Sequence, residues 1–260
     1  MDPLTPLVAN LQADGRLRVW SLVITAFGDL VQHRGGVIST ARLGDLLGRV
    51  GVEPGALRTA LSRLGQDGWV TSEREGRLSH YRLSDEGVRE FAPATSLIYA
   101  PPRCEPVSDW ALVIRLGSDP VLCPADETPD DADCCVVGAL RHLSPAFRES
   151  LVQSQYLEAL KRLAGDIGAI DAGHFSPATA AAARLLLVHR WRRIVLRHRE
   201  LPAELMPPTE PLRNPRIDVA RAYAQLAPLA EAWLDGEETT LPPMPAGDAS
   251  FDQRFREAKA

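Results

Sequence analysis

Residues 51–70 (GVEPGALRTALSRLGQDGWV) constrain the fold of this chain more than any other stretch. Pro54 suits the first turn of a helix, where its missing backbone N–H has no intrahelical partner to lose. Gly68 ends the helical pattern, and a β-like Trp-Val pair follows it. One buried face is predicted by the i, i+4, i+7 spacing of Leu57, Leu61 and Leu64. The stretch therefore predicts a short helix whose opposite face is polar and carries arginine.

The segments before this helix predict a helix-turn-helix. Residues 17–33 are strongly apolar with a period near that of a helix, which is typical of a buried helix. Residues 37–39 suit a short strand, and Thr40 is placed to cap a second helix over residues 41–50. Only a short turn separates this second helix from the one that starts near Pro54. Two helices joined in this way are typical of a helix-turn-helix.

A β-hairpin is predicted directly after the second of these helices. Val70 and residues 81–83 flank a polar tip at residues 73–77, where Gly76 supplies the turn. Ser84 is then placed to cap a further helix that reaches residue 90 or 91, with acidic residues in its first turn. This order of elements is that of a winged helix-turn-helix.

The middle of the chain predicts a small unit with little sheet. Proline-rich residues 93–107 predict a linker. Residues 110–116 and 134–140 predict two strands, with an acidic loop at 117–133 between them. A long helix is expected from about 145 to 163.

The C-terminal part is predicted to be helical. Ser176 is placed to cap a helix that runs through residue 199, and a last helix is expected over residues 217–234. An extended connection, residues 201–215, separates them. Residues 236–260 are polar and contain proline, which predicts a loosely ordered tail or a segment that docks on the rest of the chain.

Together these segments predict an α+β, mostly helical fold in three domains. Residues 1–92 form a winged helix-turn-helix DNA-binding domain. Residues 93–174 comprise the linker and a reduced α+β middle domain. Residues 175–260 form a helical C-terminal domain with a loosely ordered tail.

The distribution of charge leaves nucleic-acid binding possible although the formal net charge is −5. Residues 1–92 hold 11 arginines and 11 acidic residues, and residues 175–260 hold 12 basic and 11 acidic residues. The acidic excess lies in residues 93–174, with 12 acidic and 6 basic residues. Because DNA binding needs a local basic surface rather than a basic protein, the net charge does not exclude it.

The remaining composition argues against an enzyme, a metal protein or a membrane protein. The four cysteines are irregularly spaced, and the chain holds no P-loop, GxGxxG, GxSxG or HExxH motif. We therefore expect no enzymatic activity, no metal and no bound cofactor. No apolar run is long enough to span a bilayer, and the N-terminus lacks the pattern of a signal peptide. A cytoplasmic protein with reduced cysteines is expected.

Three stretches resemble a known family of proteins. They are TAFGDLVQHRGG (25–36), the segment from Leu57 to Gly87 that includes the hairpin, and LLLVHRWRRIVLRHRELPAELMP (185–207). With these stretches the chain resembles the PaaX family of bacterial transcriptional repressors, which control phenylacetate degradation. In that family the middle domain is ferredoxin-like. Here the acidic loop follows residues 110–116 almost at once, so a helix of that domain is expected to be absent.

The DNA-binding candidates lie on the helix after Pro54 and on the hairpin. Arginine can donate two hydrogen bonds to guanine, and serine or threonine can reach base edges or phosphates. The helix candidates are Arg58, Thr59, Ser62, Arg63 and Gln66. The alternatives are an ordinary solvated face and, for Arg63, a phosphate contact or an ion pair with Asp67. The hairpin candidates are Arg74, Arg77 and His80, and Arg34 is a further phosphate candidate.

A basic stripe in the C-terminal domain has two functional interpretations. It comprises His189, Arg190, Arg193 and Arg197. The resemblance implies an acyl-CoA effector such as phenylacetyl-CoA, whose phosphates these residues would bind; alternatively they form ion pairs across a dimer. The structural alternative is pairing with nearby acids such as Glu200 and Glu204.

The sequence therefore predicts a homodimeric repressor of an aromatic-acid catabolic operon. It would bind double-stranded operator DNA, and an acyl-CoA would release it. The alternative is a winged-helix module for protein interaction or effector sensing that does not bind DNA.

Overall fold

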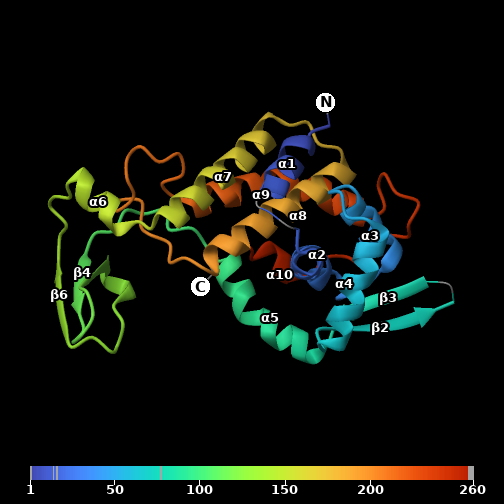
Figure 1. The fold of residues 1–260 in the computed structure, drawn as a ribbon, viewed down its shortest axis with the longest axis horizontal. Coiled ribbons are helices and arrows are strands. Elements are labelled where there is room, and N and C mark those ends of the chain that lie inside the picture. Colours follow the sequence, from blue (N-terminus) through green and yellow to red (C-terminus); the bar gives the residue numbers. More distant parts are fainter. Residues whose placement is uncertain (1, 14, 16, 77, 257–260) are drawn as a thin grey trace.

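The helix-turn-helix has the predicted form. The computed structural model describes residues 2–13, 15, 17–76 and 78–256 and is an α+β, mostly helical structure (Figure 1). Helix α3 (Thr40–Gly48) is capped by Ser39, whose hydroxyl accepts from the backbone of Arg42, so the predicted cap at Thr40 is one residue late. Helix α4 (Pro54–Gln66) begins with Pro54 in its first turn. Its buried residues include the predicted Leu57, Leu61 and Leu64.

The hairpin is also confirmed. Strands β2 (Val70–Glu75) and β3 (Leu78–Leu83) are antiparallel, and β1 (Val37–Ser39) pairs with the other edge of β3. Gly76 adopts a φ of 61°, a left-handed conformation that favours glycine at the turn. The hairpin projects from the side of the molecule as the wing of a winged helix (Figure 1).

Helix α5 (Asp85–Ile98) starts at the predicted cap Ser84 but runs well past the predicted end, so residues 93–98 are helix rather than linker. Pro93 lies inside it, at a cost of about 3 kcal/mol for a helix interior. Side chains from other helices satisfy its last carbonyl groups. Trp191 donates to Ile98 O at 2.8 Å, and Arg216 donates to Leu97 O at 2.8 Å. Tertiary contacts therefore extend this helix beyond its sequence signals.

The predicted helix over residues 17–33 is interrupted. Helix α2 (Val19–Ala26) continues into a π-helical turn (Phe27–Val31) and a 3-10 turn (Gln32–Arg34). The π-turn directs Asp29 into the interior, where its side chain is fully buried. A helix that the sequence analysis did not predict, α1 (Thr5–Ala13), precedes α2 and packs on the C-terminal helices.

Helix α8 (Pro177–Val195) forms the centre of the molecule. It lies between α9 (Pro215–Leu234) and α7 (Ser154–Ala172) on one side and α2 on the other (Figure 1). The sequence predicts an apolar face and an arginine face, but nearly all residues from Ala178 to Trp191 are buried. A helix buried all round is expected at the centre of a core.

The winged helix and the C-terminal helices share one hydrophobic cluster, which extends from Leu4 to Leu234. The first predicted domain boundary, between residues 92 and 93, falls inside α5. The division into three domains stays a prediction, but the two ends of the chain are packed together rather than separated.

A small sheet lies at the far end of the molecule from the wing (Figure 1). Its strands are β4 (Trp110–Ile114), β5 (Val121–Pro124) and β6 (Cys134–Gly138), in the order β5-β4-β6. Strand β5 occupies part of the predicted loop, so that prediction is wrong there. No helix separates β4 from β5 in this fully described stretch, as expected for a reduced middle domain.

The helix predicted over residues 145–163 is two helices, α6 (Pro145–Leu151) and α7. Val152 lies between them with an extended backbone, φ −110° and ψ 124°, and its side chain is buried. The burial of this β-branched residue in an extended conformation breaks the helical run.

The tail docks on the core, which was the second of the two predicted alternatives. Helix α10 (Ala249–Asp252) follows a backbone hydrogen bond from Asp248 to His33 O at 2.7 Å. The backbone of Phe255 donates to Tyr99 O at 2.9 Å. The segment up to residue 256 is therefore ordered against α5 and the 3-10 turn rather than loosely ordered.

In the part of the chain that the structure describes, we find no helix with the length and apolar character needed to cross a membrane.

Candidate nucleic-acid interface

The outer face of α4 presents part of the predicted set to solvent. Arg58, Ser62 and Gln66 are exposed and recur at i, i+4 and i+8. The buried leucines occupy the opposite side of the helix, so these three side chains point away from the core. We call this set the α4 outer face. It has the geometry by which a reading helix enters a DNA groove.

Thr59 and Arg63 lie on a different face of α4. They are exposed, but together with Ala56 and Ala60 they line a cleft between α4 and α8. The Thr59 hydroxyl donates to Gly55 O at 3.0 Å within the same helix. Arg63 makes no ion pair with Asp67 among the described residues, so the predicted pair is not formed. The structure thus divides the predicted DNA-reading residues between the α4 outer face and the flank that borders the cleft.

The wing candidates do not form one surface. His80 lies directly opposite Glu73, whereas Arg74 lies opposite Ser79, so His80 and Arg74 project from opposite faces of the hairpin. His80 is half-buried, and Arg74 is exposed with its Nε donating to Gly76 O at 3.2 Å. The prediction for Arg77 falls outside the described residues.

Arg34 is a structural residue rather than the predicted phosphate contact. Its side chain is buried, and its guanidinium pairs with Glu231 and Asp235, each at 2.6 Å. Burial lowers the pKa of Arg34, but the hydrogen bonds and charges of these two carboxylates outweigh it, so the net pKa is raised. A charged group held in this way is not available to a DNA phosphate.

The basic stripe on α8 is divided between the core and the cleft. His189 is buried, and its Nδ1 lies 3.0 Å from the hydroxyl of Thr25 on α2. Arg190 is also buried and forms an ion pair with Asp166 on α7, rather than with the predicted Glu200 or Glu204. These two residues therefore fix α8 to its neighbours. The half-buried Arg193 and the exposed Arg197 line the cleft.

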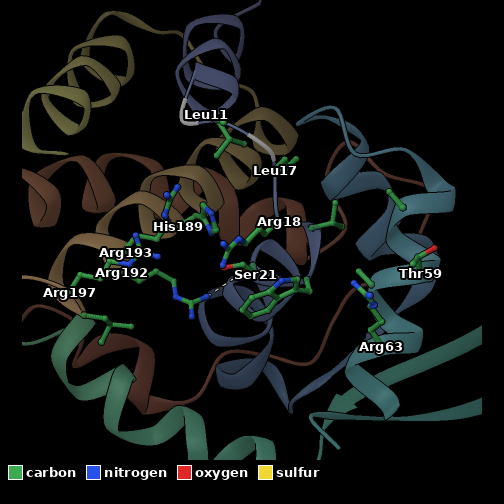
Figure 2. Close-up of a pocket in the computed structure, with 16 residues that line it drawn as sticks. Leu11, Leu17, Arg18, Ser21, Thr59, Arg63, His189, Arg192, Arg193 and Arg197 are labelled. Atoms are coloured by element: carbon green, nitrogen blue, oxygen red, sulfur yellow. Dashed lines mark hydrogen bonds between the residues drawn. The ribbon is translucent and has the colours of Figure 1, made fainter. Parts of the chain in front are cut away.

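The cleft between α4 and α8 has a volume of about 980 Å³. We call it the basic cleft, because its described lining includes five arginines and no acidic residue: Arg18, Arg63, Arg192, Arg193 and Arg197. Figure 2 shows Arg63 on α4 at one side and the α8 arginines at the other, with Arg18 and Ser21 between them. The cleft thus brings residues from three distant parts of the sequence to one place.

A buried charge cluster joins the winged helix to the C-terminal helices. At its centre, Asp29 accepts hydrogen bonds from Arg184 Nε at 2.9 Å, Tyr99 at 2.7 Å, Tyr223 at 3.1 Å and Arg254 at 3.0 Å. We call these five residues the Asp29 cluster. Burial raises the pKa of both tyrosines, so their hydroxyl groups stay protonated and donate to the carboxylate. The cluster holds the π-turn, α5, α8, α9 and the tail together.

Sequence reasoning missed several surface residues. Arg82 is exposed on the same face of the hairpin as His80, and strand alternation was the signal that identifies it. Arg18 and Arg192 in the cleft lie within helices that were predicted, but nothing in the sequence places them together. Trp20 is 43% exposed and lines the cleft. Its helical spacing with Val23 and Phe27 had indicated a core position, so that prediction is wrong.

No group of histidine, cysteine or acidic side chains in the described part of the chain is arranged to hold a metal ion.

An exposed reading helix with a wing, packed onto a helical C-terminal part, defines a winged-helix protein. The family model "PaaX-like protein" matches residues 18–87, and the model "PaaX-like protein C-terminal domain" matches residues 147–236. The chain belongs to the PaaX-like protein family, because these two models together cover more than half of it.

Two further proteins are similar to this chain. The transcriptional repressor PaaX of Escherichia coli K12 is 28% identical over 281 aligned positions, which cover 90% of this chain and 89% of that protein. A solved structure, the uncharacterized protein Rv0674 from Mycobacterium tuberculosis, has a TM-score of 0.41 and 21% identity, and covers 74% of this chain and 89% of its own.

Proposed function

We propose that this chain is a transcriptional repressor that binds double-stranded operator DNA. The observation that carries the proposal is the α4 outer face, where Arg58, Ser62 and Gln66 are exposed on the second helix of a helix-turn-helix. The similarity to the E. coli repressor supports a regulator rather than an enzyme. Binding to the promoter would take place in the cytoplasm.

The finer proposal concerns the operon and its signal. The operon encodes the catabolism of an aromatic acid such as phenylacetate, and an acyl-CoA such as phenylacetyl-CoA releases the repressor. The family to which the chain belongs supports this assignment. Release requires that the effector bind the form that is incompetent for DNA more tightly than the competent form.

A homodimer is part of the proposal, because two reading helices on a two-fold axis would contact two half-sites. Sedimentation of the full chain at micromolar concentration tests this. A mass of one chain in the presence of operator would contradict it.

The test is fluorescence anisotropy with DNA from the promoter of the neighbouring genes. Arg58→Ala removes one arginine from the α4 outer face and is expected to weaken specific binding by about 1–3 kcal/mol per site, roughly 5- to 150-fold. Arg141→Ala is the matched control. Arg141 is also exposed, but it lies next to the small sheet at the opposite end of the molecule. Equal operator affinity of the folded Arg58→Ala variant and the wild type would contradict the assignment.

A salt titration separates the repressor from the alternative, a winged-helix module that does not bind DNA. Phosphate contacts make the affinity fall steeply as salt rises. We expect such a slope for the wild type. A flat response, or no binding to promoter DNA, would favour the alternative.

A further inference from the structure

The basic cleft concentrates positive charge where no DNA contact requires it. Its arginines come from the start of α2, from the flank of α4 and from the end of α8. The α4 outer face points in another direction, and α8 forms a second wall opposite the α4 flank (Figure 2). A duplex lying on the outer face would not fill a cleft enclosed from two sides. The cleft therefore suits a separate ligand.

The state of Arg192 indicates that this ligand is an anion. Its Nη1 donates to Ser21 O at 3.2 Å and to Thr25 Oγ1 at 3.0 Å, both of which are uncharged acceptors. Burial lowers the pKa of Arg192, and no carboxylate contacts its guanidinium among the described residues. A partly desolvated cation without a counter-ion gains most from an anionic partner.

Two more features narrow the chemistry. No hydrogen bond or ion pair of the guanidinium groups of Arg18, Arg63 or Arg197 is found within the described chain, so these groups can turn toward a ligand. Arginine side chains form paired hydrogen bonds with phosphate oxygens. Trp20 exposes its indole in the same cleft, and an exposed aromatic ring can stack on a nucleobase. The volume of about 980 Å³ is at the upper end for small-molecule sites.

We propose that the basic cleft binds a nucleotide-like small molecule that carries two or more phosphate groups, and that this ligand engages Arg63 and thereby weakens DNA binding. The second half rests on the proposed repressor function. Arg63 lies on the same helix as the α4 outer face, one turn from Ser62 and Gln66 in the direction of the cleft. A phosphate held between Arg63 and Arg197 would draw the flank of α4 toward α8. Effector and operator thus compete through one side chain and the position of one helix.

Ligand binding is tested first without DNA, by isothermal titration of the full chain with coenzyme A. Pantetheine, which lacks the phosphates and the adenosine, is the matched control probe. Coenzyme A is expected to bind and pantetheine is not. Arg197→Gln is expected to weaken coenzyme A binding about 10-fold, as for the loss of one charged hydrogen bond, and Arg141→Gln is not. Absent binding of coenzyme A, or unchanged affinity in Arg197→Gln and Arg18→Gln, would overturn the site.

Three variants then test the competition. Arg58→Gln is expected to weaken operator binding only, Arg197→Gln coenzyme A binding only, and Arg63→Gln both. Loss of operator affinity in ligand-free Arg197→Gln would show that the cleft contacts DNA phosphates instead and would overturn the proposal. Wild-type affinity for operator without ligand tests the repressor function separately, so the two failures are distinguishable.

Discussion

Breaking the Asp29 cluster should destabilise the whole protein and not only the winged helix. Asp29 and Arg184 are both 0% exposed, and they join the π-turn of the N-terminal part to the central helix α8. Asp29→Asn keeps the shape of the side chain but removes its charge. Arg184 would keep Glu231, at 2.7 Å, as a partner, whereas Arg254 would lose the carboxylate that it contacts.

The structure sets the magnitude of this loss. At a separation of about 4 Å and an effective dielectric constant of about 20, one charge pair is worth roughly 4 kcal/mol. Removing one partner of a buried pair typically costs about 3–5 kcal/mol, because the other charge stays buried without compensation. We expect a loss in this range, which is a large fraction of the stability of about 5–15 kcal/mol of an ordinary domain.

Urea unfolding followed by circular dichroism measures the loss. The control is Arg221→Ala, which breaks a pair with Asp171 at 2.6 Å. That pair is shorter than the one between Arg184 and Asp29, but its side chains are 50% and 40% exposed, so its loss should cost less than about 1 kcal/mol. The reasoning is refuted if Asp29→Asn costs no more than Arg221→Ala.

Two further predictions concern stability. Burial raises the pKa of Glu231, but hydrogen bonds and charges from His33 and Arg184 outweigh it, so the net pKa lies well below the ordinary 4.5. The stabilisation by Glu231 is therefore complete above pH 4.5 and is lost as the pH falls toward the folded-state pKa. The difference in unfolding free energy between wild type and Glu231→Gln should narrow below pH 4.5; a constant difference would contradict this. Ser84→Ala removes the cap of α5, where the hydroxyl accepts from Gly87 N at 2.9 Å, and should cost about 1 kcal/mol in thermal unfolding. Ser150→Ala, on the exposed α6, should cost less than about 0.5 kcal/mol.

Local signals predicted the winged helix well, because each of its elements carries its own start or stop. Pro54 and Gly68 bound α4, and Gly76 marks the turn of the wing. The sequence analysis failed where distant residues decide the local structure. Helix α5 continues past Pro93 because Trp191 and Arg216 cap its end, and neither residue is near it in sequence.

The candidate sites divide in the same way. The α4 outer face follows from helical periodicity alone. Periodicity cannot separate an exposed arginine from one that meets a carboxylate from another helix, and so Arg34 and Arg190 were assigned wrongly to the surface. The basic cleft could not be predicted, because it forms only when α2, α4 and α8 pack together.

The shared core also predicts how the winged helix behaves alone. Every residue of α2 from Leu22 to Ala26 is at most 2% exposed, because α2 packs on α3 and α4 on one side and on α8 on the other. A fragment of residues 1–100 would lose the α8 side.

Leaving even two or three such apolar side chains in water costs about 1.5–3 kcal/mol each, which is comparable to the whole stability of a small domain. The fragment should therefore lack near-UV circular dichroism and bind an apolar dye, whereas the full chain should not. A fragment that unfolds cooperatively would show that the reading head is independent of α8. If it does not, α4 and the C-terminal helices form one cooperative unit, and a ligand between them can alter DNA binding without a flexible hinge.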